Sequence, residues 1–192
     1  MNTIKSVNDL KFSNRNNEIG KFGEQKAKEF FDLKGFSYKD VSDDYDYQVI
    51  DVDFLVDING NDEMLETKTF KDLIVNKNQL MIKYYTEYID EELKQKKGND
   101  AWLYRTHAKY MMFVCKASLQ VIIITTDALR EYIDKFKNTK FIRKQRFFDE
   151  DKEAGGKYDR YNSVYYISIK HLASQVNANG RERMKIYTDL MN

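Results

Sequence analysis

The chain has 192 residues, of which 42% are hydrophobic and 33% charged, a mix that excludes a disordered or collagen-like protein. Its 32 basic and 31 acidic residues give a net charge of +1, so the charge of the whole molecule indicates no partner. The single cysteine, Cys115, excludes an internal disulfide, and no apolar run approaches the roughly 20 residues that cross a membrane. We expect one domain over residues 1–192 in a reducing cytoplasm, with a core from about 15 to 137 and a C-terminal extension from about 138 to 192.

The first predicted element is a helix over residues 19–34. Its apolar side chains fall on one arc of a helical wheel, which predicts a face packed on a core. The members of this arc are Ile19, Phe22, Ala27, Phe30, Phe31 and Leu33. Gly35 follows at a position typical of a helix C-terminus. Glu24 lies at the rim of the arc, so its carboxylate is expected to lean over the edge of the core.

A β-hairpin is predicted next, with strands over Tyr47–Ile58 and Met64–Phe70. In the first strand two sets of residues alternate and are expected to face opposite sides. One set is Val52, Phe54, Val56 and Ile58, and the other is Asp51, Asp53, Leu55 and Asp57. The intervening Asn59-Gly60-Asn61-Asp62 is a strong turn signal. Glu66 and Lys68 are two residues apart in the return strand, so they share a face.

The rest of the chain alternates apolar strands with short helices. Strands are predicted over 79–89, 110–116, 119–125 and 163–169, a helix over 128–137 capped by Asp127, and a short helix from His171. A helix that begins near Gln79 and runs to Lys97 is the alternative for the first of these strands. This order of elements predicts a mixed α/β or α+β domain.

The charged residues of the hairpin indicate a metal site. Asp53 and Glu66 are expected to face each other from neighbouring strands, with Lys68 on the same face. Two carboxylates this close repel each other unless a cation lies between them, and Mg²⁺ prefers oxygen ligands of this kind. The lysine could orient or deprotonate an attacking water, or offset charge on a phosphorane-like transition state. The pattern therefore fits hydrolysis of a phosphodiester, and the alternative is an edge hairpin whose charged face simply meets water.

These residues resemble the PD-(D/E)XK nuclease superfamily. Its pattern is an aspartate at one strand, followed on the next strand by an acidic residue, any residue and a lysine, which Asp53, Glu66 and Lys68 match. Holliday-junction resolvases of this superfamily also carry a glutamate on the preceding helix, and the run from Gly20 to Glu24 is similar to their glycine-then-glutamate helix start. The resemblance implies a restriction-endonuclease-like core, a central mixed β-sheet flanked by helices. It also implies that Asp53, Glu66 and Glu24 bind Mg²⁺ or Mn²⁺ and that Lys68 positions or activates water.

A second likeness extends further along the chain, and several positions depart from the family pattern. Residues 78–83, 106–114 and 121–133 follow the order of elements in small phage-type nucleases of the same superfamily. Val52 stands where many members have proline, and Lys109 stands where the phage-type relatives have an acidic residue. Asp51 shares the predicted face of Asp53 and is an alternative metal ligand. Gln79 stands where a glutamine supports the site in some relatives.

A basic and aromatic stretch over residues 140–148 is the candidate contact for nucleic acid. Its basic members are Lys140, Arg143, Lys144 and Arg146. Such side chains bind phosphates in a way that depends on salt rather than on base sequence. The alternative is a loop that the phenylalanines anchor. The two histidines, His107 and His171, lack the spacing of a zinc site.

The leading hypothesis is a Mg²⁺- or Mn²⁺-dependent deoxyribonuclease that hydrolyses duplex or branched DNA. Junction resolution by a homodimer is the favoured subtype, because a symmetric pair of subunits can cut paired strands together. A phage or mobile-element origin, in the cytoplasm of a bacterial host, follows from the same resemblance. The alternatives are a catalytically inactive nucleic-acid-binding module of the same fold and a phage protein-interaction or regulatory domain.

Overall fold

A computed structural model describes residues 14–70, 78–90, 95–100, 102–116, 120–150 and 158–187. The helices are α1 (Asn14–Lys34), α2 (Tyr45–Gln48), α3 (Trp102–Arg105), α4 (Thr126–Phe136), α5 (Ile169–Val176) and the 3₁₀ turn η3 (Ala178–Gly180). The strands are β1 (Tyr38–Asp40), β2 (Phe54–Ile58), β3 (Asn61–Phe70), β4 (Gln79–Asp90), β5 (Gln95–Asp100), β6 (Tyr110–Cys115), β7 (Val121–Thr125), β8 (Ile142–Glu150), β9 (Tyr158–Ser168) and β10 (Met184–Tyr187). None of the helices in these ranges combines the length and the apolar character that crossing a bilayer requires.

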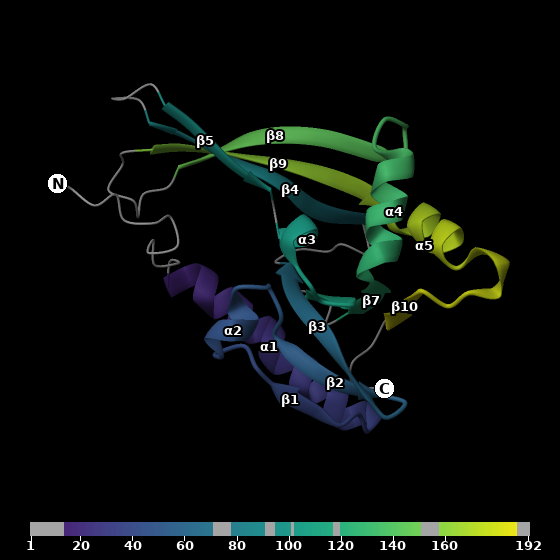
Figure 1. The fold of residues 1–192 in the computed structure, drawn as a ribbon. Coiled ribbons are helices and arrows are strands. Elements are labelled where there is room, and N and C mark those ends of the chain that lie inside the picture. The colour runs from purple at the N-terminus through teal and green to yellow at the C-terminus, as the bar shows by residue number, and fades with distance from the viewer. Residues whose placement is uncertain are drawn as a thin grey trace.

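The strands form two sheets (Figure 1). The central sheet has six strands in the order β1-β2-β3-β6-β7-β10, and it is mixed because β3 and β6 run parallel while the other neighbours run antiparallel. The second sheet has four antiparallel strands in the order β5-β4-β9-β8. The chain is therefore a mixed α/β protein with a central mixed sheet flanked by helices, as predicted. The second sheet was not predicted.

Helix α1 covers one face of the central sheet. Phe30 and Phe31 are 1% exposed and pack with Phe54, Leu65 and Met112 from three neighbouring strands. This is the amphipathic face that the sequence predicts. Leu33 is an exception because it is 54% exposed, so the buried part of the predicted apolar arc ends at Phe31.

The opposite face of the central sheet packs against α4, α5 and the second sheet. Along β6, Met112 faces the α1 cluster, whereas Met111 and Phe113 join a larger cluster with Leu129 and Leu80. A strand that is buried on both faces reads as a continuous apolar run, which is why 110–115 shows no alternation in sequence. The second sheet thus forms a third layer, next to α4 and α5 (Figure 1).

The hairpin around the predicted turn is formed by β2 and β3. Asn59 and Gly60 have φ of 56° and 81°, and Ile58 pairs with Asn61, so the turn has only two residues. Positive φ at both positions is the requirement of a type I′ turn, which the Asn-Gly pair meets at low steric cost. The return strand consequently begins at Asn61, three residues earlier than predicted.

The first hairpin strand is shorter than predicted, because residues 45–48 are helical. Asp44 caps α2 by accepting a hydrogen bond from the Asp46 N–H at 3.0 Å, and Asp51 adopts a left-handed φ of 52°. These features end the extended conformation before Phe54. Val52 therefore does not share a cluster with Phe54 but packs with Val41 in a separate one.

The remaining predicted strands and helices are present as strands and helices, but their first and last residues differ from the predicted ones. Residues 79–90 form a strand rather than a helix, although β4 pairs with β9 in the second sheet and not with the hairpin. The helix predicted to be capped by Asp127 begins at Thr126, after an N-cap at Thr125. The Thr126 hydroxyl donates to the Ala108 carbonyl at 2.6 Å. This hydrogen bond ties the start of α4 to the segment between α3 and β6. Residues 138–192 supply β8, β9, α5 and β10, so both sheets contain strands from the predicted extension.

Candidate metal and catalytic site

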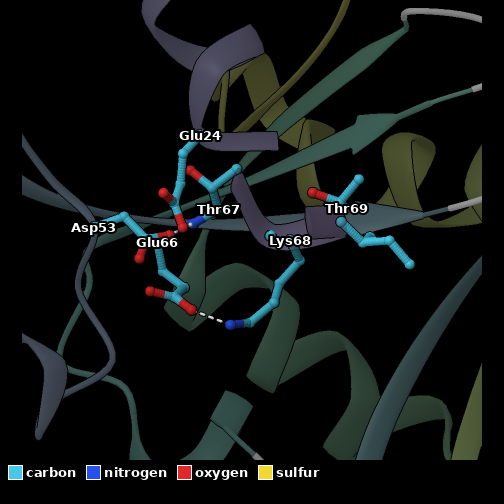
Figure 2. Close-up of a pocket in the computed structure, with 8 residues that line it drawn as sticks. Glu24, Asp53, Glu66, Thr67, Lys68 and Thr69 are labelled. Atoms are coloured by element: carbon cyan, nitrogen blue, oxygen red, sulfur yellow. Dashed lines mark hydrogen bonds and ion pairs between the residues drawn. The ribbon is translucent and has the colours of Figure 1, made fainter. Parts of the chain in front are cut away.

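A pocket of about 250 Å³ gathers Glu24, Asp53, Glu66 and Lys68, the four residues that the sequence indicated as a catalytic set (Figure 2). Glu24 comes from α1, Asp53 from the residue before β2, and Glu66 and Lys68 from β3. The remaining lining residues are Ile19, Gly20, Thr67 and Thr69. Helix α1 and the hairpin region thus contribute to one pocket.

The backbone ties Asp53 to β3. Its N–H donates to the Leu65 carbonyl at 3.0 Å, and its Oδ2 accepts from the Thr67 N–H at 2.7 Å. Asp53 therefore continues the β2–β3 ladder for one more residue, and its carboxylate is held at the edge of the strand that carries Glu66. This placement follows from the hairpin register, in which Phe54 lies opposite Leu65.

Glu66 and Lys68 form an ion pair on one face of β3. The Lys68 ammonium donates to Glu66 Oε1, and Figure 2 shows the two side chains turned toward each other. Glu66 is 3% exposed, whereas 27% of the Lys68 side chain is exposed. The Lys68 Nζ also lies 5.2 Å from the ring centroid of Trp102 on α3. A buried carboxylate thus has a partly exposed cation as its partner.

The acids of the pocket are harder to ionise than free carboxyl groups. Burial raises the pKa of Glu66 to about 7, and the nearby Asp53 adds to this rise while Lys68 opposes it. Burial likewise raises the pKa of Asp53 to about 6, with a further contribution from Glu24. Burial, followed by the charge of Asp40, raises the pKa of Glu24. Two of these carboxyl groups therefore titrate near neutral pH when no additional cation is present.

Lys68 remains a cation in this environment. Burial works to lower the pKa of its ammonium group, but the carboxylates of Glu66 and Asp53 outweigh burial and raise the pKa above its usual value. The side chain is thus protonated at neutral pH.

A close approach of α1 to β3 brings Glu24 to the pocket. Gly23 faces β3 so closely that a Cβ there would lie 1.9 Å from the Thr69 hydroxyl oxygen. Glycine at this position lets the helix backbone rest directly on the strand. The hydroxyl oxygens of Thr67 and Thr69 are buried and have no hydrogen-bond partner among the described residues.

Asp51 and Gln79 do not line the pocket. The Asp51 carboxylate pairs with Arg105 at 3.3 Å, and its charge makes a small contribution to the raised pKa of Glu66. Gln79 is exposed at the first residue of β4, in the second sheet. Lys109 forms an ion pair with Glu63.

The four basic residues of 140–146 are exposed but do not face the same way. Ile142 points into the core, so the alternation of β8 puts Lys144 and Arg146 on the same side as Ile142 and Arg143 on the other. Arg143 stacks on Tyr166, with 4.5 Å from its guanidinium carbon to the ring centroid. The strand belongs to the second sheet, whereas the pocket residues belong to α1 and the hairpin.

The individual partners of these residues differ. Lys140 lies over the Phe141 ring, and the Lys144 ammonium donates to Asn138 Oδ1 at 3.0 Å. Arg146 stacks on Tyr161 and forms an ion pair with Glu87. Each of the four basic side chains therefore has its own neighbouring partner, and together they do not form one continuous face.

Two residues near the pocket escaped the sequence analysis. Trp102 approaches Lys68, and Arg105 approaches Asp51, both from the short helix α3. No spacing in the sequence relates α3 to the hairpin, because the contact depends on how β4 and β5 return the chain to the central sheet. A lone tryptophan in a charged segment was the only available signal.

The donor set fits a hard divalent cation that keeps part of its water. Within the described ranges no three acidic, histidine or cysteine side chains converge as a ready-formed metal cluster. The binding of a cation would therefore depend on Asp53 and Glu66, with Glu24 of α1 as an additional donor. Mg²⁺ and Mn²⁺ accept one or two protein carboxylates and retain several waters. The raised pKa values of Asp53 and Glu66 indicate carboxylates that a bound cation would stabilise in the charged form.

Comparison with known proteins adds no relative to this picture. No family model matches the sequence, and neither the curated proteins nor the solved structures give a match. Arguments about function consequently depend on the residues and the geometry of this chain.

Proposed function

We propose that this protein is a metal-dependent DNA endonuclease of the PD-(D/E)XK type, with a restriction-endonuclease-like core. The observation that carries the proposal is the pocket that Asp53, Glu66 and Lys68 share with Glu24 of α1. Two acidic residues and a lysine at this spacing are the pattern of the superfamily that the chain resembles, and here the three side chains line one pocket. Metal-assisted cleavage of a phosphodiester uses carboxylates to hold the cation, and a positive group near the scissile phosphate stabilises the developing charge.

Each side chain has a distinct role in this proposal. Asp53 and Glu66 would hold Mg²⁺ or Mn²⁺, and Glu24 would assist. Bound there, the ion supplies Lewis acidity toward a phosphoryl oxygen and a more acidic water. Lys68, whose ammonium group the carboxylates of Glu66 and Asp53 keep protonated in the metal-free site, would orient or activate the attacking water or offset charge on the pentavalent phosphorus.

The substrate and the setting follow from the resemblance. Branched DNA such as a four-way junction is the proposed substrate, with duplex DNA as the broader class. A homodimer would allow paired strands to be cut together, and a phage or mobile element acting in the bacterial cytoplasm is the proposed source. The basic residues Lys140, Arg143, Lys144 and Arg146 are the proposed DNA contacts.

A nucleic-acid-binding module without hydrolysis is the second candidate. The ion pair between Lys68 and Glu66 favours it, because the lysine already neutralises one of the two principal carboxylates. In this alternative the charges of the pocket stabilise the hairpin and do not bind a cation.

A cleavage assay with matched variants separates the two candidates. Labelled duplex, single-stranded, flapped and four-way-junction DNA are incubated with Mg²⁺, with Mn²⁺ and with EDTA. The test variant is Glu66→Gln, and the control is Glu63→Gln on the same strand, whose side chain pairs with Lys109 outside the pocket.

Metal-dependent cleavage that Glu66→Gln abolishes and Glu63→Gln retains would support the endonuclease. DNA binding without cleavage of any substrate would favour the binding module. Absence of both would overturn both candidates and point to a protein partner.

A further inference from the structure

Helix α3 connects the second sheet to the candidate site. It follows β5 of the second sheet and precedes β6 of the central sheet (Figure 1). Its first residue, Trp102, approaches Lys68, and its last, Arg105, pairs with Asp51. Both ends of this short helix therefore contact charged residues of the hairpin region.

The position of α3 is fixed by contacts behind it. Arg130 of α4 donates to the Leu103 carbonyl at 2.8 and 3.0 Å and to the Thr106 carbonyl at 2.8 Å. These carbonyl groups lie at the C-terminal side of α3, where the helix itself offers them no donor. Leu103 is fully buried in the large cluster, and the Trp102 ring packs near Phe113 at 6.2 Å between centroids. The indole ring is thus held by the core and not by Lys68.

Lys68 has two attractive partners of different kinds. One is the Glu66 carboxylate, which would also serve as a metal ligand. The other is the Trp102 ring, at 5.2 Å from the ammonium nitrogen, which is within the range of a cation–π contact of about 6 Å. An aromatic ring attracts the ammonium group without offering an oxygen that would compete for a metal ion.

We propose that Trp102 is a positioning residue that keeps the Lys68 ammonium at the pocket when a divalent cation draws Glu66 away from it. This inference depends on the proposed metal-dependent function. A lysine side chain released from its ion pair regains considerable rotamer freedom, which would scatter its charge away from a scissile phosphate. The ring limits that freedom because it is itself immobilised by α3.

Fluorescence provides a test that needs no activity, because Trp102 is the only tryptophan in the chain. The variants are Lys68→Met and, as a control, Lys109→Met, whose ammonium pairs with Glu63 and lies over Tyr110 instead. We expect Lys68→Met to change the emission of the folded protein and Lys109→Met to leave it unchanged. We also expect Mg²⁺ to change the emission of the wild type in a saturable way and to have no such effect on Glu66→Gln. Wild-type emission in Lys68→Met would overturn the proposal.

Cleavage kinetics test the positioning role. Trp102→Phe keeps an aromatic face and should retain activity within about threefold, whereas Trp102→Leu should lower kcat by about tenfold with little change in KM. Phe70→Leu is the control, because Phe70 also packs against Phe113, at 5.6 Å, and contacts the same core. Equal losses in Trp102→Leu and Phe70→Leu would indicate general loosening of the core and overturn the positioning role.

The two experiments distinguish failure of this inference from failure of the proposed function. If the wild type cleaves no DNA, the proposed function fails and the positioning role of Trp102 fails with it, whatever the emission shows. If the wild type cleaves DNA and Trp102→Leu cleaves equally well, only the positioning role is overturned.

Discussion

Replacement of Gly23 by alanine should weaken the contact between α1 and β3 and, through it, the candidate site. The new Cβ would lie 1.9 Å from Thr69 Oγ1, 3.2 Å from Thr69 Cβ and 3.4 Å from Thr67 Cγ2. Rotation of the threonine hydroxyl relieves the first contact but leaves the second, so the helix must move away from the strand. Overpacking of this kind costs about 1–3 kcal/mol, and more when backbone has to shift.

Helix propensity acts in the opposite direction and sets the size of the net effect. Alanine is better than glycine in a helix interior by about 1 kcal/mol. With the overpacking cost at its upper end, Gly23→Ala should lose about 2 kcal/mol of unfolding free energy. Gly20 provides the matched control on the same helix, because the nearest atom to its new Cβ is Glu24 Oε1, at an ordinary 3.8 Å. Gly20→Ala should therefore gain up to about 1 kcal/mol, a difference of about 3 kcal/mol between the two variants.

Urea unfolding followed by circular dichroism measures this difference, with the slope of the transition as a check that both variants unfold cooperatively. A Mg²⁺ titration of melting temperature should show a smaller metal-induced rise in Gly23→Ala than in Gly20→Ala, because the displaced helix withdraws Glu24 from the pocket. If Gly23→Ala is as stable as Gly20→Ala, the inferred close packing of α1 on β3 is refuted.

Three further outcomes follow from the site and its supports. Mg²⁺ at a hundredfold excess over its dissociation constant should stabilise the wild type by about 2.7 kcal/mol, and Glu66→Gln should show little of this effect in thermal melts. In EDTA, the wild type should lose stability relative to Glu66→Gln as the pH rises from about 4 toward 7, since the raised pKa values of Asp53 and Glu66 mean that the folded state holds these protons more tightly than the unfolded chain. Melting temperatures of both proteins at several pH values check this, and a difference between them that stays constant or grows in favour of the wild type would contradict it. Arg130→Met should cost about 1–3 kcal/mol in urea unfolding, because it leaves buried carbonyl groups of the α3 region without donors; unchanged stability would show that water replaces the guanidinium.

The hairpin and α1 were predictable because their signals are local. An Asn-Gly pair between alternating strands specifies the turn and its register, and the register in turn brings Asp53 to the edge of β3 beside Glu66. Apolar residues at helical spacing specify the buried face of α1. Tyr47 and Gln48 were misassigned to the first hairpin strand because the alternation was extended back to them, whereas they belong to α2, which the N-cap of Asp44 starts.

The second sheet was not predictable from local pattern. Leu80 of β4 pairs with Ile167 of β9, and only tertiary folding brings such distant segments together. The stretch from Lys140 was interpreted from its charge as a nucleic-acid contact or a loop. Residues 142–150 form the edge strand β8 rather than a loop. Contacts across layers, such as that of Trp102 with Lys68, are likewise a product of the assembled fold.

The interior position of β3 has a consequence for how the pocket forms during folding. On one side β3 pairs with its hairpin partner β2, and on the other it pairs in parallel with β6, where Glu66 lies beside Met111. The hairpin can form early, because its closing loop is short, but the parallel pairing has to wait for closure of a much longer loop. A slip of one residue in that pairing would turn Glu66 and Lys68 toward the aromatic side chains of α1. Correct pairing of β3 with β6 is therefore a late folding step, and it decides whether Glu66 and Lys68 lie on the pocket face of the sheet.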